Sequence, residues 1–540
     1  MVSEMLKLCM KKGFLLDREM LEIFSNLSSE KANKAIEVLA ELKIEERVIT
    51  RDLATKHLGE LKCLEGFLSG EELGPEEKIG EQSLDKIKEQ NILKGPTTGV
   101  LKLLEAPAFT QKKIAVVDFV KHFRTRYASL KAMLEKHNFE NLSSLRKIES
   151  NRGNYTIIVA ILSKRITKNK NLLVEVEDMT GTSVVLVNQN KKELFEKGRE
   201  LMVDDIVALD VSGTREMLFA NDIIYPEAGL EEKRHSEFDE YVAFVSDFHA
   251  GSCNFLKKNL LKFVKWLNGE EGDLEQRELA KKVKYLIING DNIDGVNHHP
   301  GQEPFLEVKT SEGQYEVVED ILKLVRKDVV MVMSPGQHDA VWIGEPQPVI
   351  GEKYAAGLYE IENLHMVPNP SLIEINGGFK ILMYHGASIN RFIDEIPRIR
   401  TKYGHVHPSL SVKEMLKRRH LAPMHGMVDY IPCDGEDPLV IKTVPDIITT
   451  GDQHRAEVAT HNNILIVTSS CWQSITPFEE KIGNVPDPCR VPLFNLKTRE
   501  IKILDFSDGE GAEKDKADLE KVPGEDCLEY GEAEVGEDGC

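Results

Sequence analysis

The chain has 540 residues, 41% hydrophobic and 29% charged, and this length exceeds the size at which a single core stops growing, so we expect two to four domains. The net charge of −21 argues against a protein that coats nucleic acid unaided, because phosphate contacts need Lys and Arg. No apolar run approaches the roughly 18 residues that cross a bilayer, and the charged start lacks the apolar core of a signal peptide, so we expect a cytoplasmic protein outside the membrane.

The first part of the chain predicts a helical module, a linker and a small barrel. Helical periodicity over 1–72 predicts an N-terminal helical module, and the polar stretch 73–112, with scattered Gly and Pro, predicts a linker. A connecting helix region follows over 113–150. Five short alternating segments with turn signals over 151–230 predict a β-barrel of the oligonucleotide-binding type. A barrel that only supports protein contacts explains this pattern equally well.

The pattern changes over 238–507 to buried strands that alternate with helices. YVAFVSD, KYLIING, VVMVMSPG and FKILMYHG are unbroken apolar runs, as expected of strands covered on both faces. We therefore predict an α/β layered domain whose chemistry lies where strands end in loops. Residues 508–540 then hold thirteen acidic residues and three lysines, about half of the net charge, which predicts a disordered acidic tail.

Each of these four strands ends in potential metal ligands. In chain order the ends carry Asp247 and His249, then Asp291, then Gln337, His338 and Asp339, then His385. One such residue alone is equally consistent with a turn or a helix cap, but four successive strand ends make coincidence improbable. Carboxylates, imidazoles and amide oxygens suit Mn²⁺, Fe²⁺ or Zn²⁺. The two oxygens of a carboxylate placed like Asp291 can bridge a metal pair.

Two strings compete for the last pair of ligands. GHVH at 404–407 follows the charged, Pro-interrupted segment DEIPRIRTKY and has no buried strand to end. GDQH at 451–454 follows the apolar run DPLVIKTVPDIITT, and NNILIVTSS continues the sheet after it. Because strand ends place the other ligands, we favour Asp452 and His454. The histidines of 404–407 are expected in an exposed loop, solvated or touching DNA.

The order DxH, GDxxD, GQHD, lone His and GDQH resembles the signature of calcineurin-like metallophosphoesterases. The strings PGQHDAV, EPQP, KRRHLAP and VPDIITTGDQH, together with the helical start and the barrel, are similar to the small subunit of the archaeal family-D DNA polymerase. That resemblance covers nearly the whole chain except the acidic tail. It implies a four-layer calcineurin-like phosphoesterase sandwich over 238–507 and also places the last ligand pair at 451–454.

The resemblance implies a ligand set for two metal ions. One ion would take Asp247, His249, Asp291 and His454, and the other Asp291, Gln337, His385 and Asp452. Gln337 stands where the family has Asn, and Asp452 where it has His, so both departures fall on the second ion. Their oxygen donors favour Mn²⁺ over Zn²⁺. His338 would stabilise the transition state or protonate the leaving 3′ oxygen, and Asp339 would orient it.

The implied activity is a two-metal 3′–5′ exodeoxyribonuclease that prefers single-stranded or mispaired 3′ ends and proofreads for a polymerase. No segment resembles a nucleotidyltransferase centre, and the resemblance assigns DNA synthesis to a separate large subunit in complex with this chain. A catalytically silent scaffold subunit is the first alternative, and Mn²⁺-dependent cleavage that disappears in His338→Ala distinguishes the two. A stand-alone metallophosphatase is the second, but it leaves the barrel unexplained.

Several other polar and aromatic residues have a structural interpretation. His298 and His299 lie just beyond the second ligand loop, where a solvated loop is expected and contact with a substrate is the alternative. Trp472 is expected in the core. Arg418 and Arg419 suit either a phosphate or a partner carboxylate, and the sequence does not choose between them.

Overall fold

The computed structural model describes residues 100–109, 113–149, 151–433 and 435–507, and a few isolated residues before them. The chain divides into two compact units, residues 1–82 and 83–540. The described part of the first unit includes the parallel strand pair β1 (Leu15–Leu16) and β2 (Val48–Ile49). Most of the predicted helical module and linker, and the predicted acidic tail, lie outside the described residues, so the domain boundaries stay predictions.

A closed five-stranded barrel forms where five alternating segments were predicted. The strands pair in the order β5-β6-β7-β9-β8. In the sequence they follow the helix α7, and the helix α8 lies between β7 and β8. The bounds are α7 (Val116–Leu134), β5 (Gly153–Ile166), β6 (Leu172–Asp178), β7 (Gly181–Val187), α8 (Lys192–Arg199), β8 (Ile206–Thr214) and β9 (Met217–Ile224). Alternate residues of β6, Leu172, Val174 and Val176, are buried in the barrel core, as the period of two requires.

Two mixed sheets make up the following domain. The first sheet has the order β13-β12-β11-β10-β19-β20, and the second has the order β17-β18-β16-β15-β14-β4-β3. The first-sheet strands are β10 (Tyr241–Val245), β11 (Val283–Asn289), β12 (Val330–Ser334), β13 (Leu364–Met366), β19 (Arg490–Asn495) and β20 (Ile501–Asp505). The second-sheet strands are β3 (Leu93–Lys94), β4 (Val100–Glu105), β14 (Ser371–Ile375), β15 (Phe379–Met383), β16 (Ile447–Thr450), β17 (Glu457–His461) and β18 (Ile464–Thr468). Neighbours β10 to β13 are parallel, as are β15, β16 and β18.

The two sheets pack on each other, and helices cover their outer faces. Phe244 of the first sheet and Ile381 of the second belong to one buried cluster between the sheets. Ala243, next to Phe244, belongs instead to the cluster shared with the helices α9, α10 and α11. Because successive side chains of a strand point to opposite faces, a strand buried on both faces must be apolar throughout, which explains the unbroken apolar runs.

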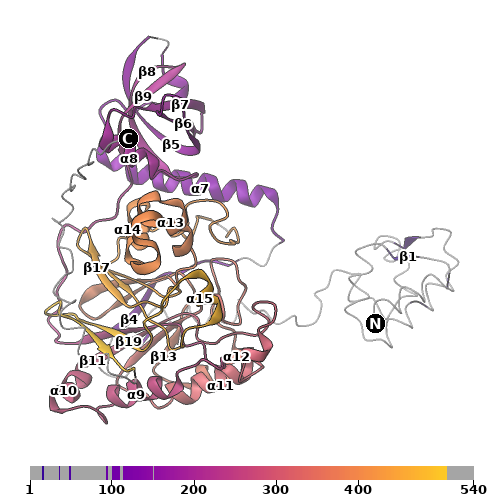
Figure 1. Cartoon of the computed structure of the whole chain (residues 1–540), viewed down its shortest axis with the longest axis vertical. Helices are drawn as coiled ribbons and strands as arrows, with labels where there is room; N and C mark the ends of the chain where they lie inside the picture. Colours follow the sequence, from indigo (N-terminus) through magenta and orange to yellow (C-terminus); the bar gives the residue numbers. More distant parts are fainter. Residues whose placement is uncertain are drawn as a thin grey trace, which may run out of the picture. The chain divides into compact units, whose positions relative to one another are not determined.

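Figure 1 shows α9, α10 and α11 on one side of the sheets and α13 and α14 on the other. The helices of this domain are α9 (Lys257–Leu267), α10 (Leu274–Lys282), α11 (Ser311–Leu322), α12 (Glu352–Ala355), α13 (Ile389–Glu395), α14 (Ser409–Arg418) and α15 (Pro477–Ile482). Phe392 of α13 and Met415 of α14 pack with Ile448 of the second sheet. The chain thus contains a mixed α/β domain with both sheets covered by helices.

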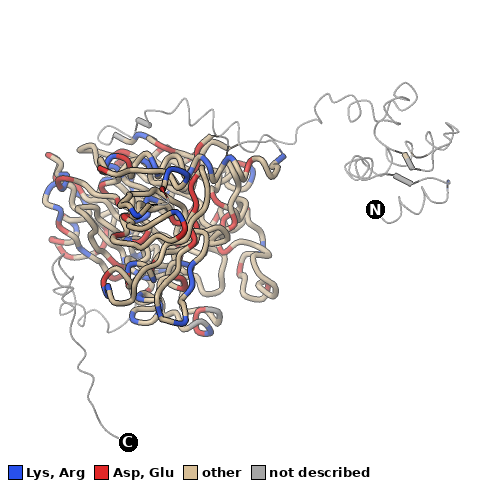
Figure 2. The backbone as a smooth tube through the Cα atoms, turned by 90° about the horizontal axis from the view of Figure 1, so that it is seen from above, with Lys and Arg blue, Asp and Glu red and all other residues tan. Residues whose placement is uncertain are grey.

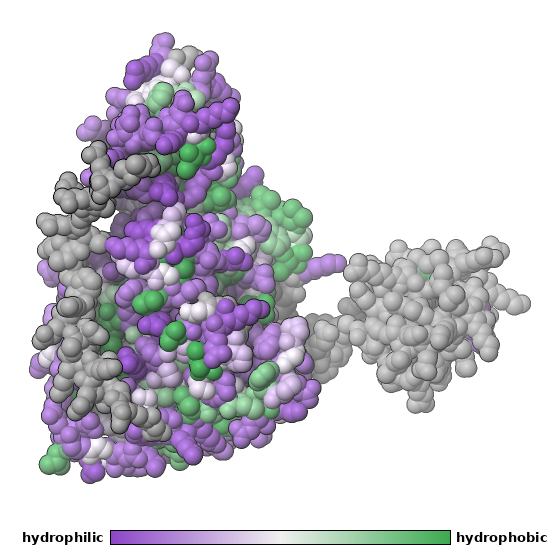
Figure 3. Space-filling model, in the orientation of Figure 1, coloured by the Kyte–Doolittle hydropathy of each residue, from purple (hydrophilic) through white to green (hydrophobic). Residues whose placement is uncertain are grey.

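Between the barrel and the two-sheet domain lies α7 (Figure 1). Its residues Leu130 and Leu134 are buried against Ile158 of the barrel and Val440 of the two-sheet domain. At the start of α7, Val116 and Val117 are exposed, and Figure 3 shows an apolar patch at this end of the helix. None of the helices in the described ranges combines the length and the apolar composition that a bilayer crossing needs.

Candidate metal centre

The candidate ligands follow the carboxyl ends of parallel strands in both sheets. In the first sheet, β10 leads to Asp247 and His249, β11 to Asp291, and β12 to Gln337; in the second, β15 leads to His385, and β16 to Asp452 and His454. The segment before GDQH is therefore a buried strand, as predicted. GHVH follows a short irregular helix over 399–403, and its first three residues form a single 3-10 turn.

The backbone at these strand ends is held in an uncommon conformation. Five of the candidate ligands, Asp247, His249, Asp291, Asp452 and His454, have positive φ angles between 49° and 66°. Non-glycine residues rarely adopt this region, and such residues gather at functional sites. The backbone of Gly336 also lies very close to Asp291, because a Cβ atom at Gly336 would lie 2.3 Å from Asp291 Oδ1. Local strain and close approach both indicate that the ligand positions are maintained by the fold.

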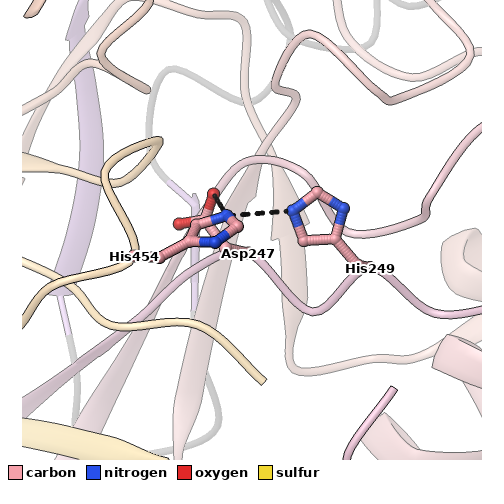
Figure 4. A group of neighbouring side chains, drawn as sticks. All are labelled: Asp247, His249 and His454. Carbon is pink, nitrogen blue, oxygen red and sulfur yellow. Dashed lines mark hydrogen bonds and ion pairs between the residues drawn. The ribbon is translucent and has the colours of Figure 1, made fainter. Parts of the chain in front are cut away.

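Asp247, His249 and His454 form the first compact group (Figure 4), with one ligand atom of each within 4.8 Å of the others. His249 Nε2 faces His454 Nε2 at 3.2 Å, and His454 Nε2 lies 3.5 Å from Asp247 Oδ1. Two nitrogen ligands on a tetrahedral ion at 2.0–2.1 Å are separated by about 3.3 Å. The donor set and its spacing therefore fit a divalent cation.

A second group contains Asp247, Asp291 and His385. His385 is fully buried, and its Nε2 lies 3.1 Å from Asp291 Oδ2 without forming a hydrogen bond of acceptable geometry. A buried imidazole nitrogen and a carboxylate oxygen that lie this close without a hydrogen bond between them fit two ligand atoms directed at a common ion. Asp247 belongs to both groups, so the two candidate sites adjoin.

Outer partners fix the orientation of three histidines. His454 Nδ1 lies 2.7 Å from Glu479 Oε1, His385 Nδ1 lies 2.8 Å from the carbonyl oxygen of Asn289, and His249 Nδ1 forms an ion pair with Asp294 Oδ1 at 3.2 Å. An acceptor at Nδ1 keeps the proton on that nitrogen and leaves the Nε2 lone pair free for a metal. The three Nε2 atoms thus face inward, where a bound cation would take the place of a proton.

Sequence reasoning assigned no role to Asp294 or Glu479. Asp294 is the second aspartate of GDNID, so its position in the motif was the available signal. Glu479 lies 25 residues after His454, in the first turn of α15, where it forms a capping box with Thr476. A capping box is visible in sequence, but nothing local connects it to a distant histidine.

Gln337 and Asp452, the two departures from the family pattern, contact each other. Gln337 Nε2 donates a hydrogen bond to Asp452 Oδ1, and the backbone N of Asp452 donates to Asp247 Oδ1 at 3.1 Å. Both line the same cavity as His454. Asp452 belongs to none of the three compact groups of acids and histidines among the described residues, the third of which contains His249, Asp294 and His338. The structure therefore places both residues beside the second group and joined to each other.

The buried charges are mutually dependent. Burial alone would lower the pKa of His385, but the Asp291 carboxylate raises it, and the net pKa is well above the usual value. Burial alone would raise the pKa of Asp291, but His385 and His338 hold it well below its usual range. Burial raises the pKa of Asp452 to about 6, although His385 opposes this shift. A buried cluster of carboxylates opposite imidazoles is an environment that a bound cation would stabilise.

His338 lies at the wall of this cluster, with its Nδ1 2.8 Å from the carbonyl oxygen of Asp294 and its Nε2 4.0 Å from Asp291 Oδ2. Its ring is enclosed by those of His249 and His298, with centroids 4.8 and 3.7 Å away. Burial lowers the pKa of His338 to about 4. The ring is therefore neutral at pH 7, with its proton on Nδ1 and its Nε2 directed toward the candidate ligands.

The prediction that Asp339 orients His338 is wrong. Asp339 Oδ1 accepts a hydrogen bond from Tyr315 OH at 2.8 Å, and Oδ2 accepts bonds from the backbone of Gly336 and from Asn292. The carboxylate points inward and joins the loops after β11 and β12. The carbonyl oxygen of Asp294 takes the orienting role instead. Burial raises the pKa of Asp339 to about 6.

The histidines outside the predicted ligand set have different environments. His407 Nδ1 forms an ion pair with Glu457 at 3.0 Å on the surface. His405 lines the cavity, and its Nδ1 lies 3.5 Å from Gln453 Oε1, so it is not simply solvated. His298 is half-buried against His338 and is thus not simply solvated, whereas His299 is exposed, as expected of a solvated loop.

Three remaining predictions concern buried residues. Trp472 is 1% exposed and belongs to the core, as predicted. Arg418 is buried between Asp205 of the barrel and Glu414 of α14. Arg419 donates hydrogen bonds to the carbonyl oxygens of Ile441 and Lys442. Both arginines therefore stabilise the fold, and neither is placed to hold a phosphate.

Most of the candidate ligands line one cavity of about 600 Å³, although Asp247 and His385 are not part of its lining. Its lining includes His249, Asp291, His338, Asp452 and His454. A volume of this size is typical of small-ligand sites, which measure roughly 300–1,000 Å³. The cavity gives a substrate access to both ligand groups and to His338.

Known proteins resemble this chain over much of its length. Residues 242–459 match the family described as the B subunit of DNA polymerase alpha/epsilon. The chain is 36% identical over 391 residues to the DNA polymerase II small subunit of Methanothermobacter thermautotrophicus, covering 72% of this chain and 79% of that one. It is 33% identical over 401 residues to the DNA polymerase II small subunit of Pyrococcus furiosus, covering 73% of this chain and 64%, less than two thirds, of that one. Among solved structures, an archaeal phosphodiesterase aligns with 49% of this chain and 98% of its own, with 13% identity and a TM-score of 0.25.

Proposed function

Because this chain belongs to the family of DNA polymerase II small subunits, we propose that it is the metal-dependent phosphodiesterase of such a polymerase. One observation supports this activity above the others. Two buried histidines, His385 and His454, have their Nδ1 atoms held by outer acceptors, His249 Nδ1 is paired with Asp294, and the Nε2 atoms of all three face the carboxylates of the site. A scaffold has no need of this arrangement, whereas a metal centre requires it.

We assign the two-sheet domain to the four-layer calcineurin-like phosphoesterases and the barrel to the oligonucleotide-binding type. The helix-covered faces of both sheets and the closed five-stranded order support this assignment. DNA synthesis would take place in a separate large subunit that forms a complex with this chain. The domain limits are those predicted from the sequence.

The centre would hold two divalent metal ions, most readily Mn²⁺. Asp247, His249, Asp291 and His454 would hold one, and Asp291, Gln337, His385 and Asp452 the other. When bound, such a pair supplies Lewis-acid activation of a phosphate and a nucleophile derived from water. Oxygen donors at Gln337 and Asp452 suit a harder ion than two imidazoles would.

The protein's own groups would orient the substrate around this centre. His338 Nε2 is the polar atom of that ring left free for the reacting phosphate, because Nδ1 is held by Asp294. A negative phosphate nearby would raise the pKa of His338 from its low value and favour donation of a proton to the leaving 3′ oxygen. Asp339, by joining two ligand loops, would keep Asn292 and Gly336 in place.

The activity we propose is a 3′–5′ exodeoxyribonuclease that removes single-stranded or mispaired 3′ ends. The test uses the full chain, alone and with its large subunit, on a 5′-labelled primer with a 3′ mismatch in the presence of Mn²⁺. We expect shortening from the 3′ end, its loss with EDTA or in His338→Ala, and normal activity in His407→Ala. If the wild-type chain binds no metal and shortens no primer, the silent-scaffold alternative is correct.

A further inference from the structure

One side of the cavity carries planar side chains that the proposed chemistry leaves unused. His298, His299 and Phe305 follow β11 and line the same cavity as Asp291 and His338. Phe305 is 52% exposed, although a phenyl ring gains hydrophobic stabilisation only when it is buried. An exposed phenylalanine beside a polar cavity therefore suggests a ligand that covers it.

The segment that carries these rings is held firmly. Gln302 is 2% exposed, accepts a hydrogen bond from the backbone of His298 and donates to the carboxylate of Asp294. The backbone of Phe305 donates to Gln302 and accepts from Cys253, both at 2.8 Å. The backbone is thus fixed on both sides of the phenyl ring. Such preorganisation lowers the entropic cost of binding a ligand.

The planar residues also lie close to the reacting position. The ring centroid of His298 is 3.7 Å from that of His338, and His338 Nε2 is 4.0 Å from Asp291 Oδ2. A ligand whose phosphate lies at the candidate metal centre would therefore place its neighbouring group against this wall. Figure 2 shows basic and acidic residues interspersed along the backbone of the described part.

We propose that Phe305, with His298 and His299, forms a subsite for a nucleobase, which holds the unpaired base of the 3′-terminal nucleotide during cleavage. This inference rests on the proposed function and names the part of the substrate that the cavity recognises. Bases stack on aromatic side chains regardless of sequence, because every base has a π-face. A paired 3′-terminal base must first break its base pair and leave its stacking neighbour, so an unpaired end enters the subsite more readily.

The kinetic test compares two single-stranded oligonucleotides that differ only in the terminal base, which is replaced by a stable abasic unit in one of them. Phe305→Ala should raise KM for the oligonucleotide with a terminal base roughly 5- to 30-fold, from a stacking contribution of about 1–2 kcal/mol. KM for the abasic oligonucleotide and kcat for both should change little. Phe305→Tyr keeps a ring and should behave like the wild type.

Phe238→Ala is the matched control, because Phe238 is 51% exposed and does not line this cavity. If the loss of any exposed phenyl ring raised KM, Phe305→Ala and Phe238→Ala would show the same rise. A rise in KM for the abasic oligonucleotide as large as that for the complete one would overturn the subsite.

A binding experiment separates this inference from the proposed activity. An oligonucleotide with 2-aminopurine at its 3′ end, bound to the metal-free full chain, should lose fluorescence as the base stacks. That quenching should persist in Phe305→Tyr and Phe238→Ala and disappear in Phe305→Ala. If the wild type quenches the probe but degrades no DNA, the subsite stands and the exonuclease proposal fails. If Phe305→Ala quenches as the wild type does, or if the wild type does not quench, the subsite is wrong.

Discussion

Removing the negative charge of Glu479 should weaken metal binding although Glu479 lies outside the ligand set. Its Oε1 lies 2.7 Å from His454 Nδ1, a charge-assisted hydrogen bond of roughly 1.5–3 kcal/mol. Changes to such outer partners typically cost 10- to 100-fold in metal affinity. We therefore expect about a tenfold loss of Mn²⁺ affinity in Glu479→Gln, which keeps an acceptor, and about 100-fold in Glu479→Ala, which does not.

The choice of variants separates metal binding from folding. Glu479 also accepts hydrogen bonds from Thr476 in the capping box of α15. Glutamine has a single acceptor oxygen and can serve either Thr476 or His454, whereas alanine loses both bonds and would cost about 1 kcal/mol of helix stability. Glu480→Ala, at an exposed neighbouring position, controls for the loss of surface charge.

The assay is titration of the metal-free full chain with Mn²⁺, followed by electron paramagnetic resonance of the free ion. Thermal unfolding of each variant in EDTA reports on folding separately. If Glu479→Gln and Glu479→Ala both bind Mn²⁺ within twofold of the wild type, His454 does not act as a ligand oriented by Glu479. The inward orientation of His454 Nε2 would then no longer support a metal centre.

Three further predictions concern the fold and the backbone of the site. Arg418→Ala should lower the free energy of unfolding by roughly 3–5 kcal/mol, because Asp205 is left buried without its cationic partner and Glu414 keeps only Arg398 and Lys417; chemical denaturation measures this, and a loss below 1 kcal/mol would contradict it. Burial lowers the pKa of His420 to about 4, below its unfolded value of about 6.5, so protons bind the unfolded chain more tightly. The free energy of unfolding should therefore fall by about 2 kcal/mol between pH 7 and pH 5. In EDTA, the free energy of unfolding of His420→Asn should depend less on pH over this range; an unchanged dependence would refute the lowered pKa of His420. Gly336→Ala should abolish Mn²⁺ binding while the barrel stays folded, because its Cβ would collide with the Asp291 carboxylate; normal Mn²⁺ affinity would show that the loop adapts.

The strand ends, and with them most of the candidate ligands, could be predicted from the sequence. Unbroken apolar runs encode strands covered on both faces, and the residue after such a run lies at a sheet edge. The same pattern favoured Asp452 and His454 over His405 and His407, and β16 does end just before Gly451. This inference needed only local pattern, because burial and strand period are local properties.

The roles of Asp339, Asp294 and Glu479 were decided by the tertiary structure. Adjacency in sequence suggested that Asp339 serves His338, but its carboxylate turns toward Tyr315 and Asn292. Which acceptor meets a given imidazole depends on how separate loops approach one another.

The same limit applies to Gln337 and Asp452, which are 115 residues apart and form a hydrogen bond, and to the ring of His298 on His338. The sequence by itself determined which chemical groups lie at the edges of the sheets, because the unbroken apolar runs mark the strands and therefore their ends. Only the packing of the two sheets determined which of those groups meet, because contacts between distant segments depend on register and loop conformation that no local pattern contains.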